Sequence, residues 1–306
     1  MNVYSNEQAD LNYTDRPPVL LAASGVAAMR RAERTISANG LRVGAKLPIE
    51  DALARIEVQA AATAVWLEID SDCGERLDEL LTHLSHDVSR GFYRAVVSTT
   101  PALLDVVMAR VSDVEVEIIV DANEAERSAA LAIAVASDDF AERFSDIGSD
   151  QNAERLRQLS EEVSRIASTL ARLSTGPSIL RRSPESAPTA ELPPLSADTI
   201  LKVIRGRRLR GKYFDETLFA DPAWDMMLDL LQSEIAQHRV PVSNLCIAAA
   251  VPATTALRWL KMLVGQGLFV RRADPHDGRR VFVELAPDTS HALRRYFAEV
   301  EQLATI

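Results

Sequence analysis

The chain has 306 residues, 47% of them hydrophobic, and a formal net charge of −10. This length predicts two domains, and the hydrophobic share is ample for packed globular cores. The opening segment is polar and no apolar run reaches the roughly 20 residues of a membrane span, so we expect neither a secretory signal nor a membrane helix and predict a cytoplasmic protein. Cys73 and Cys246 form no disulfide or metal pattern and are predicted to be core thiols.

The charge is unevenly distributed along the chain. From Ser196 onward there are 15 Lys or Arg and 13 Asp or Glu, a net charge of +2. Because the whole chain has a net charge of −10, the part before Ser196 carries −12. A whole-chain pI of about 5.1 argues against nucleic acid. A slightly basic back half beside an acidic front half is instead typical of a regulator with one DNA-facing domain.

Five strand–helix units follow a polar tail, residues 1–14, which we expect to be disordered. Short apolar runs alternate with amphipathic stretches. Strands are predicted at 18–25, 41–47, 62–70, 94–99 and 114–122, and helices at 25–40, 49–59, 74–91, 101–111 and 124–136. Strands joined by helices lie parallel, so we predict a flavodoxin-like α/β sandwich over residues 15–136.

A heptad-like pattern marks the segment 137–174. Its apolar residues are spaced by 3, 4, 3, 4 and 3 positions, which predicts a short dimerising coiled coil; an amphipathic helix packed on its own domain is the alternative. The seam residues are Leu156, Leu159, Val163, Ile166, Leu170 and Leu173. Residues 175–195 are rich in Pro and Ser and are predicted to be a linker.

The last domain, residues 196–306, is helical with one hairpin near its end. A long amphipathic helix at 221–239 precedes a short helix at 241–251, which Ser243 is expected to cap. A third helix at 252–266 runs into a hairpin at 269–285, where Asp, Pro and Gly form a turn between two arginine pairs. This order predicts a winged helix-turn-helix, an α+β domain.

The stretch "TTALRWLKMLVGQGLFVRRADPHDGRRVFVEL" resembles the recognition helix and wing of the MarR family of transcriptional regulators. The shared features are a polar helix start, a mid-helix arginine, a Gly-Leu ending, and an Asp-x-Arg wing signature at Asp277–Arg279 that leads into Val283-x-Leu285. The resemblance covers about the last 110 residues and implies a dimer that reads a pseudo-palindromic operator in double-stranded DNA.

The resemblance also implies roles for single residues. The outward side chains of the helix in the major groove are expected to be Thr254, Thr255, Arg258 and Lys261. Arg279 is expected in the minor groove or on a phosphate, with Asp277 orienting a neighbouring arginine such as Arg258. Arg271, Arg272 and Arg280 are expected on the DNA backbone. The alternative is that Arg258 and Lys261 lie on the solvated face of a core helix.

Two features of this domain are left open. The basic run at 204–212 fits either DNA steering or a solvated helix face. In MarR proteins the outer helices form the dimer, but this chain adds a front domain and a coiled coil, so the sequence does not decide which of the three elements dimerises.

The front domain resembles a response-regulator receiver in its order of elements. A working receiver needs an acidic pair after the first strand, an acceptor Asp after the third, Ser or Thr after the fourth and Lys after the fifth, to hold Mg²⁺ and a phosphoryl group. Here Asp70 and Ser98-Thr99 fit, but the first strand ends in "AASG" and the fifth in Asp121. We predict a pseudo-receiver that dimerises or binds a partner protein or small molecule.

These observations predict a dimeric, sequence-specific DNA-binding regulator that is not an enzyme and uses no cofactor or metal. His83 and His86 lie three apart without further ligands and are read as a helix surface. The alternatives are a response regulator phosphorylated at Asp70, a protein-interaction adaptor whose winged helix docks a partner, and a nucleotide-binding enzyme, for which no catalytic constellation is present.

Overall fold

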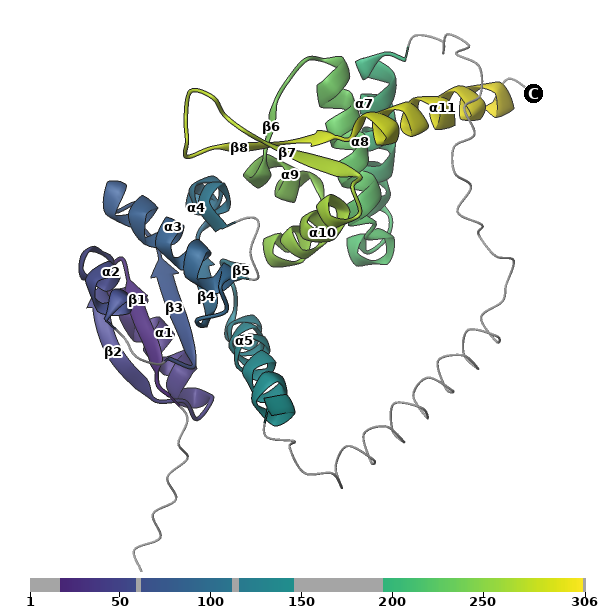
Figure 1. Ribbon diagram of the computed structural model, residues 1–306. Coiled ribbons are helices and arrows are strands. Elements are labelled where there is room, and N and C mark those ends of the chain that lie inside the picture. The colour runs from purple at the N-terminus through teal and green to yellow at the C-terminus, as the bar shows by residue number, and fades with distance from the viewer. Residues whose placement is uncertain (1–16, 59–61, 112–115, 146–194, 305–306) are drawn as a thin grey trace, which may run out of the picture.

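The computed structural model describes residues 17–58, 62–111, 116–145 and 195–304. Figure 1 shows a parallel-sheet domain followed by a mainly helical domain with a small antiparallel sheet. The predicted tail, the coiled-coil seam from Leu156 to Leu173 and nearly all of the 175–195 linker lie outside the described residues.

The first domain is built on a five-stranded parallel sheet in the order β2-β1-β3-β4-β5. Its strands are β1 (Val19–Ala23), β2 (Val43–Pro48), β3 (Ala64–Ile69), β4 (Arg94–Thr99) and β5 (Val116–Val120). β1 and β3 are buried along their whole length. Strands covered on both faces read as unbroken apolar runs rather than alternating ones, as these do.

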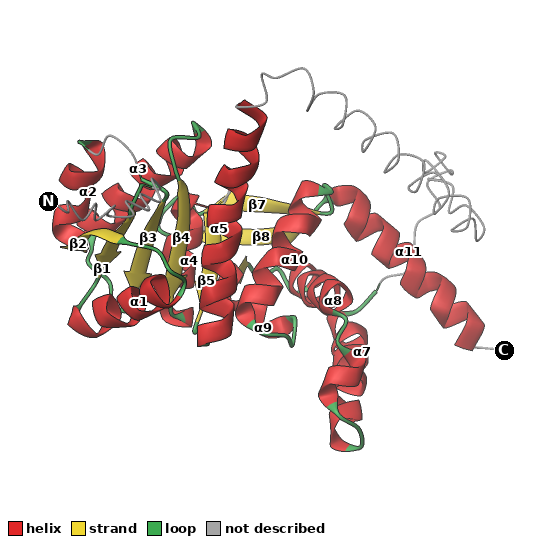
Figure 2. Cartoon of the chain, turned by 90° about the horizontal axis from the view of Figure 1, so that it is seen from below, coloured by secondary structure: helices red, strands yellow, loops and turns green. Residues whose placement is uncertain are grey.

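Helices cover both faces of this sheet, as Figure 2 shows. On one face lie α1 (Val26–Ala38) and α5 (Glu124–Ser145), which pack on Val19, Leu21 and the fully buried Trp66. On the other lie α2 (Ile49–Glu57), α3 (Glu75–Ser89) and α4 (Leu104–Val111, after a 3-10 turn at Pro101–Leu103), which pack on Leu20 and Ala22. The last helix continues past residue 136, to Ser145.

The second domain begins with α7 (Ala197–Leu209), where the Ser196 hydroxyl accepts a hydrogen bond from the Thr199 amide at 3.1 Å. Two 3-10 turns (Arg210–Lys212 and Glu216–Phe219) precede the remaining elements. These are α8 (Pro222–Ile235), β6 (Val240–Pro241), α9 (Val242–Ala248), α10 (Ala253–Gly265), β7 (Phe269–Ala273), β8 (Val281–Leu285) and α11 (Pro287–Ala304). The three strands form an antiparallel sheet in the order β6-β8-β7.

The two domains share a hydrophobic cluster. Leu104 and Met108 of α4 and Val120 of β5 belong to the same buried cluster as the core of the second domain. α10 packs on β5, while α9 and β8 pack on α4. In Figure 1 the hairpin of β7 and β8 extends above α3 and α4.

Among the described helices, no single one is long and apolar enough to cross a bilayer; α9 and α10 reach that hydropathy only together, across a 108° bend.

Candidate nucleic-acid interface

The second domain holds α10 and the β7–β8 hairpin in the arrangement of a winged helix-turn-helix. α9 and α10 meet at a bend of 108°, and the hairpin follows α10 after the turn residue Gly267, whose φ of +72° favours glycine. One face of α10 enters the core through Ala256, Leu260 and Leu263. The predicted helix and hairpin are therefore present, at Ala253–Gly265 and Phe269–Leu285.

The opposite face of α10 carries the residues expected to face DNA. At 100° per residue, Thr254, Thr255, Arg258 and Lys261 fall within one arc, opposite the core-facing residues. Thr255, Arg258 and Lys261 are exposed. Three of the four residues predicted to point outward are therefore exposed, on the face of α10 away from the core, and their contact with DNA stays a prediction.

Thr254 differs from this expectation because it is only 7% exposed. Its Oγ1 accepts a hydrogen bond from the Val120 amide of β5, at 3.2 Å. β5 is the edge strand of the parallel sheet, so this amide points away from β4 and toward α10. The prediction that Thr254 faces solvent is wrong, because the front domain packs on that part of the arc.

A second contact joins α10 to the front domain. Nη2 of Arg258 lies 3.6 Å from Oε2 of Glu117, and the two side chains are 59% and 31% exposed. An ion pair this open to water stabilises the contact weakly.

The wing carries a compact turn with its own hydrogen bonds. The Asp274 amide donates to the Arg280 carbonyl at 3.1 Å, and Oδ1 of Asp277 accepts from the Arg279 amide at 2.9 Å. Asp277 pairs with Arg280 at 3.3 Å, so the arginine that it orients is Arg280 and not Arg258. An Asp two residues before an amide forms such a local turn more readily than it reaches another element.

The wing arginines divide between two surroundings. Arg272 pairs with Glu284 across the hairpin at 3.2 Å, and both side chains are exposed; Arg271 is partly buried. Arg279 instead reaches the front domain. Its Nη2 donates to Oδ1 of Asp72 at 2.7 Å, and its Nε lies 3.2 Å from Oδ1 of Asp78, an ion pair without hydrogen-bond alignment.

The pKa values of this contact shift in the directions that an ion pair requires. The hydrogen bond from Arg279, with a second from the Gly74 amide, lowers the pKa of Asp72. The same bond to Asp72 raises the pKa of Arg279. Both groups are therefore charged at neutral pH.

Three further hydrogen bonds join the domains. Nη1 of Arg110 donates to the Gly278 carbonyl at the wing turn, at 2.6 Å. Asp105 of α4 accepts from the Ser243 amide at 3.0 Å and from its hydroxyl at 2.5 Å. Ser243 was expected to cap α9, but Pro241 occupies the N-cap and Asp105 binds the free donors of that helix start.

Four acids of the front domain thus contact the helix-turn-helix and the wing. We call them the carboxylate surface: Asp72, Asp78, Asp105 and Glu117. The sequence alone does not bring these acids together, because they are 6 to 45 positions apart and come from α3, α4, β5 and the loop before α3.

The basic run at 204–212 is partly structural. Arg207 pairs with Asp225 at 2.8 Å, the Arg208 guanidinium donates to the Ala248 carbonyl, and Arg210 stacks over the Phe219 ring at 4.5 Å. Arg205 and Lys212 are exposed. Three arginines of the run therefore make contacts within the domain, and three of its cations, Arg205, Arg208 and Lys212, are exposed.

At the carboxyl ends of the parallel strands, the guanidinium of Arg31 lies between Glu68 and Asp70. Nη2 of Arg31 lies 2.7 Å from Glu68 and 2.5 Å from Asp70, and these carboxylates raise its pKa. The Asp70 amide donates to the Ser24 hydroxyl at 2.8 Å. One of the two carboxylate oxygens of Asp70, the predicted phosphoacceptor, is thus engaged by a guanidinium.

A buried ion pair beneath this edge was missed by sequence analysis. Glu68 and Arg127 are 1% and 3% exposed, and Nη2 of Arg127 lies 2.6 Å from Oε2 of Glu68. Thr35 and Ser98 accept further bonds from Arg127, at 3.2 and 3.0 Å, and Trp66 donates to Glu68 at 2.7 Å. The sequence signal for this ion pair was Glu68, a single acid near the end of an otherwise apolar strand.

The histidine pair at α3 fits the expected helix surface. His83 and His86 contact the same carboxylate, Asp87, at 3.1 and 3.2 Å. Within the described ranges, no three His, Cys, Asp or Glu side chains are grouped to hold a metal ion.

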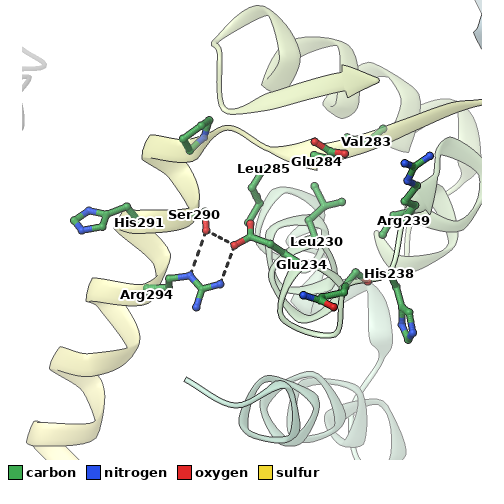
Figure 3. Close-up of a pocket in the computed structure, with 14 residues that line it drawn as sticks. Leu230, Glu234, His238, Arg239, Val283, Glu284, Leu285, Ser290, His291 and Arg294 are labelled. Atoms are coloured by element: carbon green, nitrogen blue, oxygen red, sulfur yellow. Dashed lines mark hydrogen bonds and ion pairs between the residues drawn. The ribbon is translucent and has the colours of Figure 1, made fainter. Parts of the chain in front are cut away.

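A cavity of about 600 Å³ lies between α8, β8 and α11 (Figure 3), and Val283, Glu284 and Leu285 of the wing strand β8 are among its lining residues. On its wall, Oε1 of Glu234 accepts from the Ser290 hydroxyl at 2.7 Å and from Nη2 of Arg294 at 2.8 Å. These bonds tie α11 to α8, and Figure 3 shows the three side chains pointing toward one another.

Comparison with known proteins gives no family assignment. No family model and no curated protein matches the chain. Solved structures give partial overlaps: the adhesin competence repressor AdcR from Streptococcus pyogenes (19% identity, 35% of this chain, 75% of that chain, TM-score 0.21), the RcsB response regulator from Salmonella typhimurium (15%, 51%, 83%, 0.28) and the transcriptional regulator Tm0710 from Thermotoga maritima (18%, 35%, 77%, 0.22). Scores this low assign no activity to the chain.

Proposed function

We propose that the chain is a sequence-specific, double-stranded DNA-binding transcriptional regulator of MarR type. The recognition helix at 252–266 enters the major groove and the wing at 269–285 contacts the minor groove or the backbone. The observation that carries this proposal is the placement of Thr255, Arg258 and Lys261 on the face of α10 that the core does not use. The wing adds four arginines beside that face: Arg271, Arg272, Arg279 and Arg280.

The other contacts of these cations support the same reading. Arg258 and Arg279 are held by carboxylates of the front domain. Arginine binds carboxylate and phosphate with the same fork of donors, so a surface that holds carboxylates is suited to phosphates. We propose that Arg258 reads a guanine edge and that Arg279 holds a phosphate or enters the minor groove.

The front domain is proposed to be a pseudo-receiver that assembles or senses rather than one that is phosphorylated. The support is Arg31, which binds Asp70 where a receiver keeps a metal and phosphoryl site. Incubation with acetyl phosphate and Mg²⁺ should leave Asp70 unlabelled. Stoichiometric labelling would instead establish the response-regulator alternative.

Dimerisation is proposed to come from the coiled-coil seam, Leu156 to Leu173, which lies outside the described residues. A dimer places two winged helices on half-sites about one helical turn apart. The rival is an adaptor whose winged helix docks a partner protein, and it predicts that Arg258→Ala and Arg279→Ala leave function intact.

The test compares two lysines in the full chain. Lys261 is exposed on the DNA-facing arc of α10, and Lys202 is exposed on α7. Binding of a mixed-sequence 30-base-pair duplex is measured over a series of salt concentrations. Lys261→Ala should weaken binding and reduce the slope of log K against log salt by about 0.9, the value for one lost phosphate contact.

Lys202→Ala removes the same charge from the chain and should leave both values at those of the wild type. Equal effects of the two substitutions would show that binding follows net charge alone. The assignment of α10 as the DNA-reading helix would then fail.

A further inference from the structure

We propose that the carboxylate surface competes with DNA for the recognition helix and the wing, so that the chain binds its operator only after the two domains separate. This inference rests on the proposed function and adds its regulation. In the arrangement of Figure 1, the front domain occupies positions that a duplex would need.

The recognition helix shows the steric conflict. A helix of about 10–12 Å diameter fills the major groove, which is about 12 Å wide, and its outward arc must touch the base edges. On this arc Thr254 is 7% exposed, and its Oγ1 is bound to the Val120 amide. β5 and a DNA duplex therefore exclude each other on the same side of α10.

The wing shows the chemical conflict. Arg279 is held by Asp72 and Asp78, and the Gly278 carbonyl accepts from Arg110. In the proposed function, Arg279 gives its guanidinium donors to DNA. Asp72 and Asp78 therefore compete with DNA phosphates for Arg279. Because they belong to the same chain, their effective concentration at Arg279 is high, and DNA in solution must compete against it.

We infer that the contact between the two domains is weak enough to open. Its apolar part is small, with Leu104, Met108 and Val120 as its buried members from the front domain. Its polar part includes the partly exposed ion pairs of Arg258 and Arg279, which contribute little each and weaken with salt. The remaining polar contacts are the hydrogen bonds at Thr254, Ser243 and Gly278. With such a closed state, only the open molecules bind DNA, so the apparent affinity for DNA is the affinity of the open state multiplied by the fraction of molecules that are open.

The first experiment weakens the closed state without touching the DNA-facing residues. Asp72→Asn with Asp78→Asn removes two charges opposite Arg279 and keeps the shape of both side chains. Asp51→Asn with Glu57→Gln is the matched control, since both acids are exposed on α2 and the charge change is equal. All proteins are full-length, and the probe is the mixed-sequence 30-base-pair duplex at fixed salt.

The interface variant should bind the duplex roughly threefold to thirtyfold more tightly than the wild type, while the control stays within about twofold. If wild type, interface variant and control bind equally, the competition is refuted and the proposed function stands. If none of the three binds even at low salt, both fail.

The second experiment uses only the wild type and so does not depend on how a variant folds. The amide of Val120 has Thr254 as its partner across the interface. Adding duplex DNA should therefore speed hydrogen exchange at Val120 and slow it along α10. DNA that binds while leaving Val120 as protected as before would contradict the inference.

Discussion

Removal of Arg127 is expected to destabilise the front domain more than any surface change. Nη2 and Nη1 of Arg127 bind the two oxygens of Glu68, which is 1% exposed, at 2.6 and 3.0 Å. Arg127→Met therefore leaves this carboxylate with Arg31 as its remaining cation, and Arg31 is 34% exposed and contacts Oε1 alone. Breaking a buried pair from one side costs about 3–5 kcal/mol. Losing the Thr35 and Ser98 bonds adds to this cost.

The assay is urea unfolding followed by fluorescence of Trp66, which is fully buried and donates to Glu68. Trp224→Phe and Trp259→Phe in every protein make Trp66 the reporter. With a slope of about 2 kcal/mol per molar urea, the midpoint should fall by about 2 M. Adding Glu68→Gln to Arg127→Met removes the buried negative charge that Arg31 alone would otherwise balance, and should recover most of the loss.

A midpoint shift below about 0.5 M for Arg127→Met would refute this reasoning. It would mean that Arg31 alone holds the buried carboxylate of Glu68 at little cost. The failure of Glu68→Gln to recover stability would point instead to lost packing on the Trp66 ring, over which Arg127 lies at 5.2 Å.

Three other predictions concern separate parts of the chain. Burial raises the pKa of the Cys246 thiol to about 12, so at pH 8 this thiol should resist alkylation in the folded protein. The more exposed Cys73 should react first, and in denaturant the two thiols should be alkylated at equal rates. Gly267→Ala should cost about 1 kcal/mol in thermal unfolding, because its φ of +72° strains a residue with a Cβ; an unchanged melting temperature would contradict this. Leu159→Asp with Ile166→Asp should turn a dimer into a monomer in sedimentation equilibrium if the predicted seam is the dimer contact, and a persisting dimer would assign that role to another element.

Most of the secondary structure followed from local patterns. The buried strands read as apolar runs, and the turn residues Asn39-Gly40 and Gly267 marked helix ends close to those observed. The two-residue strand β6 was missed, since Val240–Pro241 has too few residues for a period. It forms because Val240 pairs with Val283 of a strand more than forty residues later, which no local pattern contains.

The sequence predicted those features of the candidate interface that lie within a single helix or hairpin, and not the contacts between the two domains. The arc of Thr255, Arg258 and Lys261 follows from helical periodicity, and the wing turn from its Asp and Gly residues. The burial of Thr254 and the pairing of Arg279 with Asp72 depend on how two domains pack. Such contacts join positions up to 207 residues apart, beyond any motif.

The most direct test of the central claim is selection of duplexes from a random-sequence library by the full-length protein, followed by sequencing, with Arg258→Ala in parallel. We predict a pseudo-palindromic motif for the wild type and a relaxed preference at one base pair of each half-site for Arg258→Ala, a loss of about 1–3 kcal/mol of discrimination there. If neither the wild type nor the Asp72→Asn/Asp78→Asn protein enriches any motif at low salt, the winged helix does not read DNA.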